Sequence, residues 1–120
     1  MIKIMHTDLG TVYMEESALA KLAGSIATQC YGVVGMVYRS RRDGIASLLK
    51  RDKMGKGISV RMVDGGLAIA LHIMVEYGVN IGAVSESIIQ HVKYQMAENT
   101  GLAISEVTVH IESIRAQGIK

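Results

Sequence analysis

The stretch that decides the fold is Asp64-Gly65-Gly66 followed by LAIALHIMVEY, which runs from Leu67 to Tyr77. Asp-Gly-Gly is a strong signal for a tight hairpin turn, because glycine adopts the positive φ angles that such turns require. The apolar run after it begins at this turn and ends at Gly78. We therefore predict one long β-strand that follows a hairpin.

The two faces of this strand differ in character. Side chains alternate along a strand, so one face carries Leu67, Ile69, Leu71, Ile73, Val75 and Tyr77. The opposite face carries Ala68, Ala70, His72, Met74 and Glu76. On the first face, the residues from Leu67 to Val75 are expected to form the core. The second is small and apolar rather than charged, which makes it a candidate protein interface.

The rest of the chain supplies further strands and two main helices. Apolar spacing and turn residues predict strands at 10–14, 33–38, 58–63 and 106–112, helices at 17–29 and 81–100, and a short helix at 44–50. We expect Asp43 to cap the short helix and Asn80 to cap the last one. The predicted fold is a two-layer α+β domain in the order β-α-β-β-β-α-β. Its sheet is mostly antiparallel, and both main helices cover one face.

Length and composition indicate one domain over residues 1–120, with a basic insert at 39–56. Apolar residues make up 49% and charged residues 20% of the chain, and no proline-rich linker marks a boundary. The longest apolar stretch, Gly65 to Val75, is about half a membrane span, and residues 1–8 do not resemble a secretory signal. We therefore expect a cytoplasmic protein without a transmembrane segment.

The basic insert has a net charge of +5, and the rest of the chain has a net charge of −3. Its candidate docking residues are Arg39, Arg41, Arg42, Lys50, Arg51 and Lys53. Three interpretations stay open: a solvated loop, docking to an acidic protein or anionic lipid, and nucleic-acid binding. Nucleic-acid binding is the least favoured, because only Tyr38 places an aromatic ring beside these cations.

Candidate chemistry is sparse. His72 and His110 together could bind a metal or sense pH, but no Cys, Asp or Glu stands at ligand spacing beside either one, so we expect solvent-facing or interface histidines. Cys30 ends a helix and is expected to be a buried, unreactive thiol. Ser87 and His91 have no acid to orient the histidine. We predict no catalytic, cofactor-binding or metal residues and no small-molecule substrate. The candidate interface consists of Ala68, Ala70, His72, Met74 and His110.

Two blocks resemble a known family. Gly10 to Met36 reads GTVYMEESALAKLAGSIATQCYGVVGM, and Ile58 to Val109 contains the more specific segments EYGVNI (Glu76 to Ile81) and NTGL (Asn99 to Leu102). Together they resemble the alkaline-shock (general-stress) protein family of Gram-positive bacteria over nearly the whole chain. The chain departs from the family pattern at Ser113, where that family usually has glycine. The resemblance therefore does not predict the conformation of the last turn.

The resemblance implies a non-catalytic cytoplasmic scaffold or adaptor in envelope stress response and cell-envelope homeostasis. Such a protein acts by self-association and by contacts with other proteins, a membrane-anchored partner at the inner membrane face being one option. One alternative is a nucleic-acid-binding module that uses segment 39–56. A more remote one is an accessory protein to a fatty-acid kinase related to dihydroxyacetone kinase. One subgroup of the family resembles this chain in the 44–50 insert, and the gene in that subgroup often neighbours such a kinase.

Overall fold

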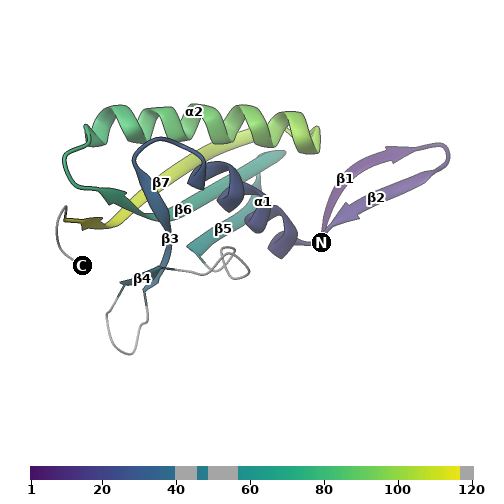
Figure 1. Ribbon diagram of the computed structural model, residues 1–120. Helices are drawn as coiled ribbons and strands as arrows, with labels where there is room; N and C mark the ends of the chain where they lie inside the picture. Colours follow the sequence, from purple (N-terminus) through teal and green to yellow (C-terminus); the bar gives the residue numbers. More distant parts are fainter. Residues whose placement is uncertain (40–45, 49–56, 117–120) are drawn as a thin grey trace.

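A computed structural model describes residues 1–39, 46–48 and 57–116, and shows two helices packed on a β-sheet (Figure 1). The elements are β1 (Ile2–Thr7), β2 (Gly10–Met14), α1 (Glu16–Thr28), β3 (Val33–Arg39), β4 (Ala46–Leu48), β5 (Ile58–Val63), β6 (Gly66–Glu76), α2 (Ile81–Thr100) and β7 (Ile104–Arg115). The predicted α+β class and the predicted order of helices and strands are confirmed. Strands β1 and β4 were not predicted.

Strand β6 is the centre of the main sheet. Strand β7 pairs with it in parallel along nearly its whole length, from Leu67 to Glu76. Strands β5 and β3 both pair with β6 in antiparallel fashion, β5 beside residues 66–71 and β3 beside residues 73–75. A strand has only two edges, so β5 and β3 follow one another along the edge opposite β7. The sheet is mostly antiparallel, as predicted, with β7 as its one parallel strand among the described residues.

The turn between β5 and β6 fixes the register of the sheet. Asp64 and Gly65 have φ angles of 50° and 81°, the pair of positive values that tight hairpins favour. A Cβ atom on Gly66 would lie 2.5 Å from Ser105 Oγ and 3.0 Å from the Ala103 carbonyl oxygen. That close approach lets the Leu67 amide donate to Ala103 O (2.9 Å) and the Ser105 hydroxyl donate to Val63 O (2.6 Å). The start of β7 is thereby held against the hairpin.

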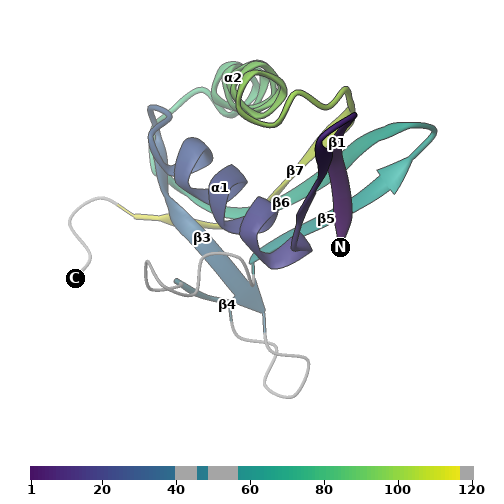
Figure 2. The same ribbon diagram turned by 90° about the vertical axis from the view of Figure 1, so that its right-hand side faces the viewer.

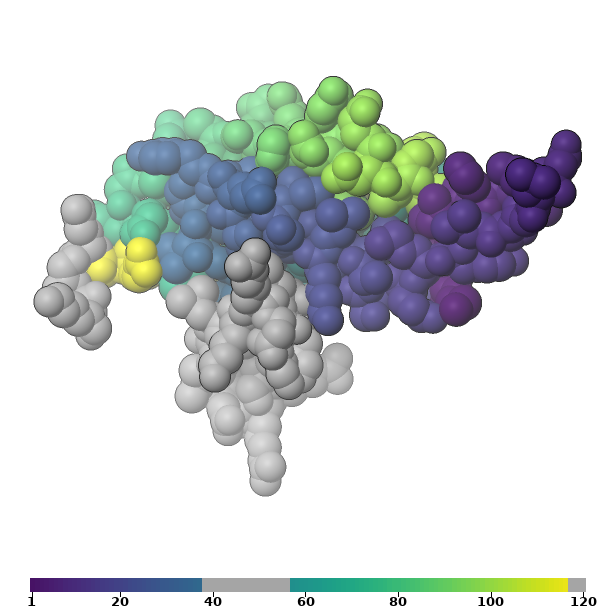
Figure 3. All heavy atoms as spheres, turned by 45° about the vertical axis from the view of Figure 1, so that its right-hand side comes forward, coloured from purple at the N-terminus to yellow at the C-terminus, as the bar shows by residue number. Residues whose placement is uncertain are grey.

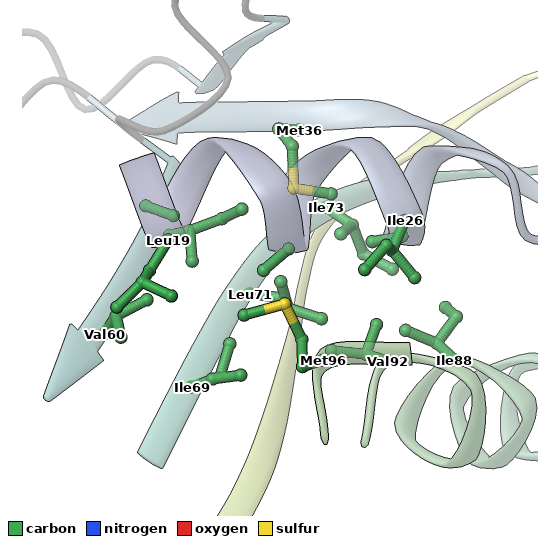
Figure 4. Packing of buried hydrophobic residues seen from close by; sticks show 14 of the residues in the cluster. Leu19, Ile26, Met36, Val60, Ile69, Leu71, Ile73, Ile88, Val92 and Met96 are labelled. Carbon is green, nitrogen blue, oxygen red and sulfur yellow. The ribbon is translucent and has the colours of Figure 1, made fainter. Parts of the chain in front are cut away.

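Both helices cover the same face of the sheet (Figure 2), and on that side α1 lies against α2 (Figure 3). The predicted core face of β6 is confirmed, since Leu67, Ile69, Leu71, Ile73 and Val75 are each at most 1% exposed. Apolar side chains of α1 and α2 meet this face, among them Leu19, Ile26, Ile88, Val92 and Met96 (Figure 4). Burial of this face supplies the main driving force for folding.

Helix α2 begins and ends where the sequence predicts. The Asn80 side chain accepts a hydrogen bond from the Ala83 amide at 3.0 Å, as an N-cap does. The helix ends at Gly101, whose φ of 74° is the left-handed conformation of a C-cap glycine. Its buried stripe is Val84, Ile88, Val92, Met96 and Thr100.

Strands β1 and β2 form a separate two-stranded hairpin that extends away from the main sheet (Figure 1). Ile2 at its base is buried in the core, and Met14 packs against the same cluster. Leu9 at its tip is fully exposed. The hairpin is therefore anchored at its base only.

Two sequence expectations were wrong. Ala46–Leu48, expected within a helix at 44–50, is strand β4, which pairs Val37 with Leu48 and Arg39 with Ala46. The other residues of that predicted helix lie outside the described residues. So short a helix is unstable by itself, whereas the edge of β3 offers unpaired backbone groups. Tyr77, expected as the last residue of the long strand, lies beyond β6 and is 65% exposed, because the chain turns at Gly78.

Candidate interface on the open sheet face

The face of the sheet opposite the helices carries the predicted interface residues. We call it the open face, and it consists of Ser59 and Arg61 on β5, Ala68, Ala70, His72 and Met74 on β6, and Glu106, Thr108 and His110 on β7. Both helices of the described chain lie on the other side of the sheet (Figure 2). The β6 residues are buried or partly buried, while the residues on β5 and β7 are exposed. At Ala68 and Ala70, where β5 and β7 both flank β6, the central strand therefore forms a low floor between the exposed side chains of β5 and β7, which we call its walls.

The register of the three strands aligns the floor residues of β6 with the wall residues of β5 and β7 in rows across the sheet. Arg61, Ala68 and Glu106 lie side by side across β5, β6 and β7. The next row is Ser59, Ala70 and Thr108. Because the alanines are short, the flanking side chains enclose a shallow hollow of about 180 Å³ above them. The open face thus has a hollow with small apolar residues at its base and polar residues around it.

His72 and His110 are brought together as direct neighbours across β6 and β7. Their rings are stacked, with centroids 4.5 Å apart and planes inclined by 7°. His72 Nδ1 also lies 3.0 Å from Glu112 Oε1. Sequence reasoning placed no carboxylate beside either histidine and so missed Glu112. The sequence did contain one indication of this contact, because Glu112 follows His110 by two residues and alternation places both on the same face of the strand.

The register shift between β6 and β7 explains why Glu112 reaches His72. Ile73 pairs with Ile111, but Met74 pairs with Ser113, so Glu112 is the extra residue of a bulge.

Within residues 1–39, 46–48 and 57–116, no three His, Cys, Asp or Glu side chains are placed to hold a metal ion.

Ser113 lies inside β7 rather than at a turn. Its hydroxyl is buried and has no hydrogen-bond partner in the described chain. The strand continues to Arg115, whose side chain pairs with Glu76 and whose carbonyl accepts from the Tyr77 amide at 2.9 Å. The replacement of the usual glycine by Ser113 therefore leaves the strand intact.

The two charged residues beside the floor, Arg61 and Glu106, differ from the paired Glu76 and Arg115. Among the described residues, neither Arg61 nor Glu106 makes an ion pair. Both are exposed, and they carry opposite charges on opposite sides of Ala68. Beside Ala68, the open face therefore carries one exposed cation and one exposed anion.

The remaining candidates lie elsewhere. Cys30 is partly buried, and this burial raises the pKa of its thiol. Ser87 is exposed and His91 partly exposed on α2, and no hydrogen bond joins them in the part of the chain that the structure describes. Arg39 ends β3. The other docking candidates, Arg41, Arg42, Lys50, Arg51 and Lys53, lie outside the described residues.

Fold and site together define a two-layer α+β protein with one covered and one open sheet face. Residues 4–116 match the model of the alkaline-shock protein 23 family, which is described as having a "cell envelope-related function". The uncharacterized protein YloU of Bacillus subtilis is 30% identical over 112 residues, which cover 92% of this chain and 93% of YloU. The uncharacterized protein Spy1614 of Streptococcus pyogenes is 31% identical over 115 residues, 95% of each chain. The chain belongs to the alkaline-shock protein family.

A solved structure of a MamM-CTD variant shares the fold. It has a TM-score of 0.50 and 14% sequence identity, and the match covers 86% of this chain and 99% of the other. At this identity the likeness concerns the fold alone. Separately, neither α1 nor α2 in the described chain has the length and apolar character needed to cross a membrane.

Proposed function

We propose that this protein is a non-catalytic scaffold or adaptor in envelope stress response and cell-envelope homeostasis. It acts by self-association and by contacts with other proteins, and the open face makes these contacts. The observation that carries the proposal is the composition of β6, where Ala68, Ala70 and Met74 stand on the face that no described helix covers. The cell-envelope setting rests on membership of the alkaline-shock protein family.

A sheet face in contact with water usually alternates polar and charged side chains with the buried ones. On β6 no charged residue occurs between Gly66 and Val75. Two such faces can pack together as in a β-sandwich, where small side chains let the sheets approach. Met74 has the largest apolar side chain of β6 on this face and is only partly buried in the described chain, so its remaining apolar surface makes it the best single anchor.

The proposed place of action is the cytoplasm, with peripheral binding at the inner membrane face through a protein partner. The basic segment 39–56 is the proposed second contact, to an acidic protein or anionic lipid. The alternative functions are nucleic-acid binding by that segment, most of which lies outside the described residues, and service to a fatty-acid kinase.

The test measures self-association of the purified chain. Sedimentation velocity from low to high micromolar concentration should show a mass above that of the monomer. Met74→Glu should shift the equilibrium towards monomer, because it places a carboxylate in the contact. Tyr94→Glu is the matched control, since Tyr94 is 63% exposed on α2 and far from the open face in the fold.

The second measurement is in-cell crosslinking followed by identification of the bound proteins. Envelope proteins recovered with the wild type and lost with Met74→Glu would support the adaptor role. A wild-type chain that stays monomeric and recovers no partner would exclude it.

A further inference from the structure

We infer that the open faces of two copies pack together about a two-fold axis that runs along β6, so that Arg61 of each copy pairs with Glu106 of the other. This inference rests on the proposed self-association through the open face. It adds that a second copy of the chain occupies the open face, how that copy is oriented, and which residues determine the orientation.

The first step is the position of the two charges. Arg61, Ala68 and Glu106 form one row across three neighbouring strands, with Ala68 in the middle. Neighbouring strands lie 4.7–4.9 Å apart, so the two charged residues stand on either side of β6 at equal distances, about 10 Å from each other. The row is therefore symmetric in position and opposite in charge.

The second step is the effect of a two-fold rotation. Rotation by 180° about an axis that lies in the interface along β6 exchanges the positions of β5 and β7. Arg61 of one copy then lies over Glu106 of the second copy, and the reverse pair forms at the same time. One pair of residues thus gives two ion pairs, as an isologous interface requires. The same rotation places Ser59 of one copy over Thr108 of the other, and it places the two Ala68 residues over each other.

The same charges disfavour a two-fold axis that crosses the strands at this row. If the axis lay in the interface but ran across the strands along this row, each strand would face its own equivalent. Arg61 would then oppose Arg61, and Glu106 would oppose Glu106. Opposed like charges in an interface cost several kcal/mol, so the charge pattern favours the axis along β6 over this one.

The third step is packing. Stacked sheets lie about 10 Å apart and keep their strands within about 30° of each other. Ala68 and Ala70 are short side chains and do not obstruct that approach along β6. His72 and Met74 lie further along the same axis, so each faces its own equivalent. The helices remain on the two outer surfaces.

Charge exchange between copies gives a specific test. Arg61→Glu produces a copy that is acidic on both sides of β6, and Glu106→Arg produces a copy that is basic on both sides. Each variant alone places two pairs of like charges in the dimer, so we expect dimerisation roughly 100-fold weaker than for the wild type. An equimolar mixture of the two variants restores both ion pairs in a heterodimer, and so does the double variant.

The measurement is sedimentation equilibrium of the full chain, with each variant alone, mixed and combined. Lys93→Glu and Glu98→Arg are the matched charge-reversal controls, because both residues are exposed on α2. Circular dichroism spectra of all variants establish that they are folded. We expect the mixture to form heterodimers although neither variant dimerises alone at the same concentration.

The possible failures are separable. If Met74→Glu dissociates the wild-type dimer but the mixture of charge variants stays monomeric, the two-fold arrangement is wrong and self-association through the open face stands. If either single variant dimerises as tightly as the wild type, the Arg61–Glu106 pairing is likewise wrong. If the wild type never exceeds the monomer mass, both the arrangement and the proposed self-association are wrong.

Discussion

His72 and His110 stack directly opposite one another across the parallel strands β6 and β7, with ring centroids 4.5 Å apart. The near-parallel planes, inclined by 7°, bring two flat surfaces into contact on the open face. Glu112 Oε1 lies 3.0 Å from His72 Nδ1 and fixes the orientation of that ring. The pair therefore contributes to the cohesion of β6 and β7 as well as to the surface that a partner would meet.

The stacked pair should stabilise the fold modestly. Directly opposed pairs on antiparallel strands contribute about 0.2–1 kcal/mol relative to alanine pairs, and we expect the same order for this stack across parallel strands. We expect His72→Ala and His110→Ala each to lower the free energy of unfolding in urea by an amount in this range. A double-mutant cycle isolates their coupling. Additive effects of the two substitutions would show that the rings do not interact in solution.

Zinc should not raise the melting temperature. A metal ion bound by a histidine nitrogen lies in the plane of that ring, and one ion cannot lie in the planes of two stacked, nearly parallel rings at once. In addition, the described residues provide no group of three metal-binding side chains. Thermal melts with and without excess Zn²⁺ are therefore expected to coincide. A rise that His72→Ala and His110→Ala both remove would contradict this prediction.

Ser113→Ala should stabilise the protein. The Ser113 hydroxyl is buried without a hydrogen-bond partner in the described chain, and such a group costs about 1–3 kcal/mol. Its removal should raise the free energy of unfolding by about 1 kcal/mol. Ser105→Ala is the opposite control, because the Ser105 hydroxyl donates to Val63 O at 2.6 Å. We expect that control to lose about 0.5–1.5 kcal/mol in the same urea titration. Equal responses of the two variants would show that Ser113 has a partner in solution.

The core of this fold could be predicted because its signals are local. Alternation along 67–75 assigned the core face of β6, and the Asn80 and Gly101 caps set the limits of α2. Strand β4 could not be predicted in this way, since three residues carry too little periodicity and their conformation depends on the edge of β3.

The open face was predicted in part. Its β6 residues and His110 follow from alternation, but the alignment of β7 with β6 depends on contacts between segments that α2 separates. The sequence therefore did not reveal that Glu112 lies beside His72. Alternation along β5 makes Arg61 a polar position, yet its alignment with Glu106 appears only when both strands are placed beside β6.

Gly66→Ala should destabilise the protein because β7 approaches Gly66 too closely for a side chain. The new Cβ would lie 2.5 Å from Ser105 Oγ and 3.0 Å from two backbone atoms of residues 103–105. The side chain can move, but the backbone atoms can yield only by displacing the start of β7, so we expect a loss of about 1–3 kcal/mol. Gly82→Ala is the matched control, since the nearest atom to its Cβ, Asn80 Oδ1, is at an ordinary 3.5 Å. In the first turn of α2, alanine should instead gain up to about 1 kcal/mol. Urea denaturation of both variants checks the pair, and a neutral Gly66→Ala would mean that β7 does not pack against the hairpin as the structure shows.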